Sequence, residues 1–342
     1  MRGEENAEKE AFFEGYYIFS NPSATLVLTM PTNIAIIDLG SARSKLFVGY
    51  LSEEGKVVTV TVSKAETGLL SKIQPTGEIL AEEVSTFIEA IRGLLEVARA
   101  ERVTSVILLA TEALRKTTSQ GTIVERLKNE LGLEVNLLSP AVEADILYAG
   151  IQSGSGNQTA VVDIGGGSVQ LAWGHGKSIS IPTGTFALEK RFQTPEQLPT
   201  DEAYAAIRAN VSHELSLSLA GKKIHVERLI VGSSCMRDFF DSVMTLTGVV
   251  TQAKEEYSAE EVDRLFTIIA GRPYESLGEY FPINLKFMYG ADKLLINLQE
   301  LLKATDCSSI LPTNESLSTS LVRVASQVGD MGRVGLRASP LV

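Results

Sequence analysis

The stretch 160-AVVDIGGGSVQLAWGHGK-177 decides the fold, because its pattern occurs a second time as 35-AIIDLGSARSKLFVGYLSEEGK-56. Each copy has an apolar run, an aspartate, a turn of small residues and a second strand-like run. The two aspartates, Asp38 and Asp163, are 125 residues apart. Side chains beyond each turn alternate with a period of two rather than 3.6. Each copy therefore predicts a β-hairpin and disfavours the strand, glycine loop and helix of a dinucleotide-binding fold.

Predicted strands and helices alternate through the rest of the chain, which is typical of an α/β protein. An apolar stripe predicts a helix over about 80–100, and a long helix is expected near 284–304. The hinge-like composition of 153-SGSGNQ-158 suggests a domain boundary there. We therefore expect lobes at 31–153 and 154–330 and a tail at 331–342. Residues 1–30 are expected to be a poorly ordered extension, or to precede the true start at Met30.

The composition of the 342-residue chain is that of a folded protein, with 44% hydrophobic and 21% charged residues. Its formal charge of −11 argues against broad nucleic-acid binding, because phosphate backbones favour clustered positive charge. No run approaches the roughly 20 apolar residues that span a bilayer, and the acidic start is unlike a secretory signal. We expect a cytoplasmic protein that binds neither nucleic acid nor membrane.

Cysteine and histidine do not indicate a catalytic or metal centre. Cys235 and Cys307 have no metal-like spacing and suggest no disulfide framework. His175, His213 and His225 are scattered, and surface or structural roles are expected for them.

The two Asp-x-Gly turns point instead to phosphate. Glycine lets backbone N–H groups converge on a phosphate oxygen, and a nearby aspartate can hold a divalent cation directly or through water. One such turn alone is more simply a tight hairpin. Its duplication favours a phosphate site, with both turns lining one cleft if the halves are related by a pseudo-twofold axis.

At these residues the chain resembles the exopolyphosphatase and guanosine pentaphosphate phosphohydrolase (Ppx/GppA) family, within the actin-like ATPase superfamily. The resemblance runs from about Asn33 to Phe239. It rests on five blocks in the family's order and a weaker sixth: 37-IDLGSARSKL-46, 110-ATEALRKT-117, 139-SPAVEADILYAG-150, 161-VVDIGGGSVQL-171, 181-IPTGTFALEKRF-192 and 229-LIVGSSCMRDF-239.

This resemblance implies two duplicated RNase H-like (actin-like ATPase) domains with an interdomain cleft. It also implies Mg²⁺-dependent release of terminal phosphate from inorganic polyphosphate or guanosine pentaphosphate. Relatives commonly form homodimers, so a homodimer is possible.

Residue roles follow from the same resemblance. Glu143 matches the catalytic glutamate that orients and deprotonates the attacking water, and Arg115 matches an arginine that contacts phosphate. Asp163 matches the metal-associated aspartate, and Gln170 stands at the position of a metal-binding glutamate. The phosphate-binding positions are Asp38, Gly40, Ser41, Lys45, Gly165, Gly166, Gly167 and Ser168.

For three of these residues a simpler role stays open. A carboxylate at Glu143 also suits the first turn of a helix. Arg115 could be an exposed arginine at a helix start, and Lys45 a solvated strand lysine.

The chain departs from the family pattern at several positions. Gln170 replaces a glutamate, Ala187 replaces an arginine, and LPTNESLSTSL from Leu311 replaces a C-terminal GLREG signature. In the first turn a GSNS sequence is replaced by one ending in Arg43, which would bind phosphate or face solvent.

Two main hypotheses follow, an active phosphohydrolase and a catalytically weak or inactive sensor of polyphosphate or nucleotide. A sugar or acetate kinase is disfavoured because no adenosine-binding motif is convincing.

Overall fold

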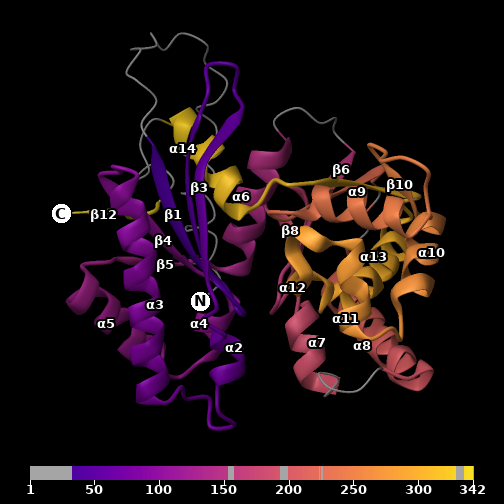
Figure 1. Cartoon of the computed structure of the whole chain (residues 1–342), viewed down its shortest axis with the longest axis horizontal. Coiled ribbons are helices and arrows are strands. Elements are labelled where there is room, and N and C mark those ends of the chain that lie inside the picture. Colours follow the sequence, from indigo (N-terminus) through magenta and orange to yellow (C-terminus); the bar gives the residue numbers. More distant parts are fainter. Residues whose placement is uncertain are drawn as a thin grey trace. The chain divides into compact units, whose positions relative to one another are not determined.

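The computed structural model describes residues 33–152, 158–192, 199–222, 224, 226–328 and 335–341 (Figure 1). The predicted extension at 1–30, nearly all of the predicted hinge and His225 lie outside these residues. The chain divides into two compact units. The first runs to Ser139 and resumes at Ser318, and the second is Pro140–Leu317.

The first unit contains a six-stranded sheet that begins with the predicted hairpin. The strand order is β12-β4-β1-β2-β3, with β5 also paired to β4. The pairs β1–β2 and β2–β3 are antiparallel, whereas β1–β4 and β4–β5 are parallel. The strands are β1 (Ile34–Leu39), β2 (Ser44–Leu51), β3 (Val57–Ala65), β4 (Ser105–Ala110), β5 (Val135–Leu137) and β12 (Ser339–Pro340).

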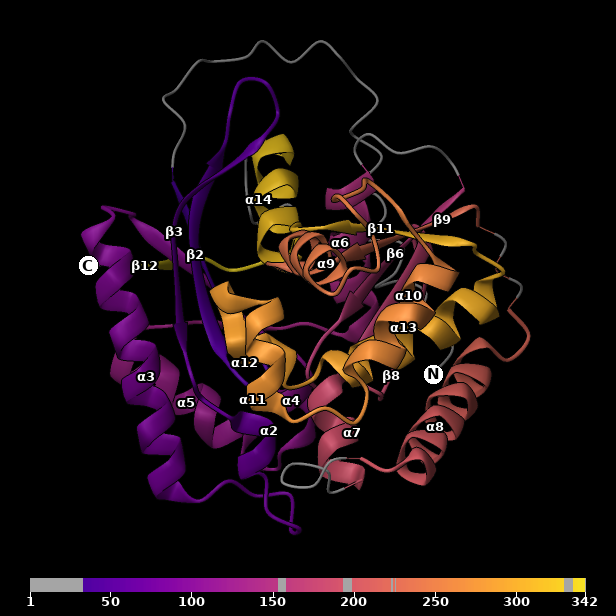
Figure 2. The same ribbon diagram turned by 45° about the vertical axis from the view of Figure 1, so that its right-hand side comes forward.

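Helices lie on both sides of this sheet, and Figure 2 shows α3 on one side and α14 on the other. The apolar stripe predicted for α3 is confirmed, because Val84, Phe87 and Ile91 on it are all buried. The helices of this unit are α2 (Leu69–Lys72), α3 (Ala81–Ala100), α4 (Glu112–Lys116), α5 (Gln120–Leu131) and α14 (Leu317–Val328).

The second unit repeats the arrangement in a sheet of order β10-β11-β9-β6-β7-β8. The β6–β7 and β7–β8 pairs are antiparallel, and β6–β9 and β9–β11 are parallel, as in the first unit. The predicted duplication is therefore confirmed at the level of strand pairing. The strands are β6 (Thr159–Ile164), β7 (Val169–Gly174), β8 (Lys177–Ile181), β9 (Arg228–Gly232), β10 (Tyr257–Ser258) and β11 (Ser309–Thr313).

Helices cover the second sheet and bury a large apolar core between themselves and the strands. They are α6 (Pro140–Gln152), α7 (Thr185–Phe192), α8 (Asp201–Leu219), α9 (Met236–Leu246), α10 (Ala259–Ile269), α11 (Tyr274–Leu277), α12 (Leu285–Met288) and α13 (Ala291–Thr305), with short 3₁₀ turns at Gly278–Tyr280 and Pro282–Asn284. Among the residues that the structure describes, no helix is both long and apolar enough to cross a membrane.

The C-terminal segment differs from its expected arrangement. Sequence reasoning placed 318–330 in the second lobe, but Arg323 of α14 donates from Nη1 to the Gly55 carbonyl of the first unit at 2.6 Å. A tail was expected from 331, but β12 pairs with β4, and Ser339 is only 1% exposed. Its Oγ accepts from the Glu134 amide at 2.8 Å. These hydrogen bonds join residues that are 268 and 205 positions apart, so local sequence did not reveal them.

Candidate functional site

The first turn, Gly40–Arg43, joins β1 to β2. Gly40 donates its N–H to the Arg43 carbonyl at 3.1 Å. The Ser41 carbonyl accepts from the Leu70 amide at 3.0 Å, and the Ala42 carbonyl accepts from Gly68 at 2.8 Å. In a trans peptide the C=O and the following N–H point in opposite directions. The amides of Ala42 and Arg43 therefore point away from the 68–70 segment.

The second turn, Gly165–Ser168, joins β6 to β7 in the same way. Gly165 donates to the Ser168 carbonyl at 2.9 Å, and the start of α7 holds the turn. Thr185 donates to the Gly165 carbonyl at 3.0 Å and Ala187 to that of Gly166 at 2.8 Å. The amides of Gly166 and Gly167 consequently point away from α7. Successive N–H groups on one side of a turn form a concavity that suits an anion.

Asp38 and Lys45 are cross-strand partners at the mouth of the first turn. The Asp38 residue keeps some exposed surface, but its Oδ1 is buried and has no hydrogen-bond partner in the structure. Burial raises the pKa of the Asp38 carboxyl, and the positive charge of Lys45 offsets part of that rise. The pair places one cation and one poorly solvated carboxylate oxygen beside the turn.

Replacing Asp38 by Asn is expected to stabilise the fold at neutral pH. A carboxyl whose pKa is raised in the folded state contributes stability at low pH, and that contribution is lost as pH rises through the raised pKa. Asparagine carries no charge, so it avoids the penalty for burying the ionised carboxylate, and at pH 7 Asp38→Asn should gain about 1 kcal/mol or more. The gain in stability should shrink as the pH is lowered towards 3.8, which is the ordinary pKa of an aspartate carboxyl. Urea unfolding from pH 4 to 8 measures it, and a variant less stable than the parent at pH 7 would contradict this account.

Asp163 and Gln170 occupy the corresponding cross-strand positions in the second unit. Gln170 is 2% exposed, and its Nε2 donates to the Ser168 hydroxyl at 2.7 Å. Gln170 thus stands where the first unit has Lys45, but its side-chain nitrogen is turned to the loop itself.

Magnesium fits the aspartates better than it fits Gln170. Mg²⁺ commonly takes one or two carboxylates and completes its shell with water and substrate phosphates. No group of three or more His, Cys, Asp or Glu side chains that could hold a metal occurs among the described residues. The unpartnered Oδ1 of Asp38 is an oxygen that a cation would satisfy. Gln170, in contrast, presents its nitrogen to Ser168.

Glu143 lies in the first turn of α6, which begins at Pro140. The residue is 6% exposed, so its carboxylate lies largely out of bulk water. Proline at the first helical position costs no hydrogen bond, and the helix N-terminus favours a negative charge there. The local sequence therefore places a stabilised, desolvated carboxylate at this position.

Arg115 lies at the end of α4. This helix follows β4, whose C-terminal end lies beside that of β1 and therefore near the first turn. Its Nη1 donates to the Leu138 carbonyl at 2.5 Å, and its Nη2 pairs with Glu112 at 3.0 Å. The guanidinium thereby holds the chain shortly before Pro140. Contact of Arg115 with phosphate stays a prediction.

Arg43, at the tip of the first turn, was expected either to bind phosphate or to face solvent, and in the structure it forms an ion pair with a carboxylate. Its Nε pairs with Glu66 at 3.0 Å, in a partly exposed ion pair.

Sequence reasoning missed two residues that support the second turn. Asn297 of α13 is 1% exposed, accepts from the Thr183 hydroxyl at 2.8 Å and donates to the Thr183 carbonyl at 2.8 Å. These two hydrogen bonds fix the segment that leads into Gly184, whose α-carbon packs directly against the turn. The only signal in the sequence was a polar side chain one position before Leu298 and three after Leu294, among the buried positions of α13.

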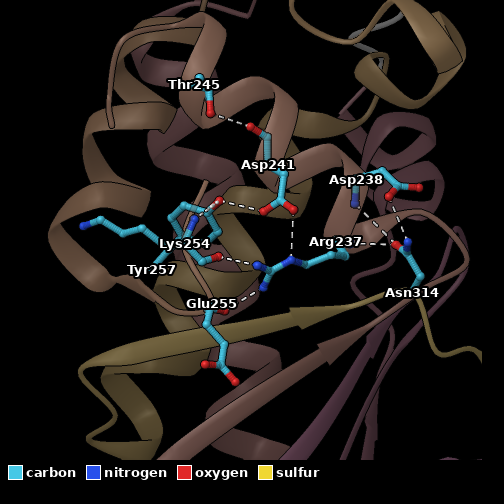
Figure 3. Close-up of polar contacts among 8 residues, drawn as sticks. All are labelled: Arg237, Asp238, Asp241, Thr245, Lys254, Glu255, Tyr257 and Asn314. Atoms are coloured by element: carbon cyan, nitrogen blue, oxygen red, sulfur yellow. Dashed lines mark hydrogen bonds and ion pairs between the residues drawn. The ribbon is translucent and has the colours of Figure 1, made fainter. Parts of the chain in front are cut away.

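The weaker glycine block that ends in α9 has a structural role (Figure 3). Asn314 accepts from the amides of Arg237 and Asp238 at 2.9 and 3.4 Å, and so caps the start of α9. The Arg237 guanidinium donates to the carbonyls of Lys254 and Glu255 at 2.5 and 2.7 Å. Asn314 belongs to the stretch that replaces the family's C-terminal signature. In this chain that stretch caps the N-terminus of α9.

Comparison with known proteins identifies the fold. The model of the Ppx/GppA phosphatase family matches residues 50–276. A solved exopolyphosphatase from Cytophaga hutchinsonii has a TM-score of 0.72 at 19% identity, covering 87% of this chain and 99% of that one. A solved Ppx/GppA member from Aquifex aeolicus has a TM-score of 0.67 at 20% identity, covering 86% and 97%. The predicted α/β class with two duplicated actin-like ATPase domains is confirmed.

A curated relative, an uncharacterized protein of Streptomyces coelicolor, is 24% identical over 208 residues. The match covers 58% of this chain and 62% of the relative, so this chain spans somewhat less than two thirds of the relative's length.

Proposed function

The chain belongs to the Ppx/GppA phosphatase family, and from this premise we propose that it hydrolyses the terminal phosphoanhydride bond of inorganic polyphosphate or guanosine pentaphosphate. The observation that carries the proposal is the second turn. Two carbonyls held by α7 direct the amides of Gly166 and Gly167 to the opposite side. This arrangement binds phosphate oxygens through the backbone, without the need for a strongly basic protein.

The chain's residues would divide the work of phosphoryl transfer. Backbone amides of both turns, with Lys45 and Arg115, would hold phosphate oxygens and offset their charge. Glu143 would orient a water molecule towards the terminal phosphorus and accept its proton. Mg²⁺, held by Asp38 or Asp163 together with water and phosphate oxygens, would supply further neutralisation of the transferring group.

The second candidate function is a sensor that binds the phosphate chain without turnover. Two departures favour it. Gln170 removes a carboxylate that would hold a metal, and Ala187 removes a guanidinium at the start of α7. The backbone amide of Ala187 still donates to the Gly166 carbonyl, so phosphate binding by the turn would survive.

The two candidates differ in turnover. Phosphate release from polyphosphate and from guanosine pentaphosphate should be measured with the full chain, in Mg²⁺ and in EDTA, alongside calorimetric binding of the same compounds. Release that depends on Mg²⁺ supports the hydrolase, and its rate on the two substrates decides between them. Binding without release selects the sensor. Absence of both overturns the phosphate assignment.

A further inference from the structure

The contact between Gln170 and Ser168 determines what the second turn can offer to an anion. Both side chains are buried, with exposures of 2% and 4%. The amide group of Gln170 donates from Nε2, so the Ser168 oxygen is the acceptor, at 2.7 Å. Because the carboxamide supplies the hydrogen of this bond, the hydroxyl hydrogen of Ser168 is not used in it.

A glutamate at this position would act in the opposite way. An ionised carboxylate can only accept hydrogen bonds, so it would take the single hydrogen of the Ser168 hydroxyl. The lone pairs of Ser168 would then face an incoming phosphate. The carboxylate would also add a negative charge next to that phosphate, which a metal ion would have to offset.

We propose that Gln170 is a positioning residue that makes the Ser168 hydroxyl a hydrogen-bond donor to a phosphate oxygen, so that the second turn binds a terminal phosphate without a metal ion at position 170. The Ser168 hydroxyl joins the amides of Gly166 and Gly167 as a third donor. This inference rests on the proposed phosphate-binding function. It adds that the second turn needs no metal ion at position 170 to bind phosphate.

Two features of the structure support this assignment over a purely structural role for Gln170. The residue lies across the strand pair from Asp163, at the turn rather than within the core. Its partner Ser168 is the last residue of that turn, whose carbonyl already accepts from Gly165. Ser168 is therefore fixed through its main chain, and its hydroxyl remains to be oriented by Gln170.

The test compares Gln170→Glu with the parent chain, using calorimetric binding of inorganic tripolyphosphate in EDTA and in Mg²⁺. The parent is expected to bind in EDTA, and Mg²⁺ should raise its affinity by less than it raises that of Gln170→Glu. Gln170→Glu should lose at least about tenfold in EDTA, equivalent to about 1.4 kcal/mol, and regain affinity in Mg²⁺. Gln252→Glu adds the same charge at an exposed loop of the same unit and should bind like the parent.

A second variant, Ser168→Ala in the parent background, keeps the test decisive if Gln170→Glu folds poorly, because parent-like binding of tripolyphosphate by Ser168→Ala in EDTA would by itself overturn the inference. Ser168→Ala removes one oxygen and should weaken tripolyphosphate binding in EDTA by about fivefold or more in the parent. In the Gln170→Glu background it should have little effect, because the hydroxyl no longer donates to phosphate. Equal effects in both backgrounds, or unchanged binding by Gln170→Glu in EDTA, would overturn the inference.

Failure of the inference is distinguishable from failure of the proposed function. A chain that releases phosphate and whose Gln170→Glu variant binds tripolyphosphate normally in EDTA keeps the function and loses the inference. A parent chain that neither binds tripolyphosphate nor releases phosphate loses both.

Discussion

A Glu143→Gln variant is expected to release phosphate at least about a hundredfold more slowly than the parent, while still binding its substrate. The change keeps the size of the side chain and removes only its ability to accept a proton. Glu143 lies in the first turn of α6 and is largely buried, so an ionised carboxylate there is supported by the helix end rather than by bulk water. A general base must be close to the attacking water, and substrate binding by the two turns does not require it.

The measurement is single-turnover phosphate release, together with calorimetric binding of the same compound. Asp145→Asn is the matched control, because Asp145 lies on the same helix and is equally buried. Its Oδ1 accepts from the Gly176 amide at 3.0 Å, which an asparagine oxygen can also do. Asp145→Asn should therefore retain most of the rate. A Glu143→Gln variant as fast as the parent would remove Glu143 from the mechanism.

The repeat and its two hairpins were predictable because their signal is local. Alternation after each turn, the glycines and the aspartates all occur within about 20 residues, and they yielded the β1–β2 and β6–β7 pairs correctly. The helix over 81–100 was equally predictable, because its buried face repeats with helical spacing.

The supports of the turns were not predictable because they come from distant segments. Thr183 and Asn297 are 114 residues apart, and Asn314 caps a helix that begins 78 positions earlier. The long helix expected near 284–304 is interrupted before Ala291, where Gly290 lies so close to Thr185 that a β-carbon would come within 2.9 Å of it. No periodicity encodes such an approach. Tertiary contacts decide where local propensity is weak.

A Gly184→Ala change is expected to disrupt the second turn and to lower both stability and phosphate binding severely. A β-carbon at Gly184 would lie 2.5 Å from the carbonyl carbons of Gly166 and Gly167 and closer still to the Ser168 nitrogen. All three are main-chain atoms, so the clash cannot be relieved by rotating a side chain. Overpacking typically costs about 1–3 kcal/mol, and here the displaced atoms are those that carry the phosphate-binding amides. We expect a loss of about 2 kcal/mol or more in urea unfolding, and at least about tenfold weaker tripolyphosphate binding.

Gly93→Ala provides the matched comparison, because the same methyl group is added in the interior of α3, where no atom outside the neighbouring backbone of the helix lies within 4 Å of the new β-carbon. Alanine is favoured over glycine in a helix by about 1 kcal/mol, so this variant should be more stable than the parent and bind tripolyphosphate equally well. Opposite signs for the two variants would show that the space at the turn, and not the loss of a glycine, causes the damage. A Gly184→Ala chain as stable as the parent would mean that α7 can withdraw from the turn. The direction of the Gly166 and Gly167 amides would then not depend on α7.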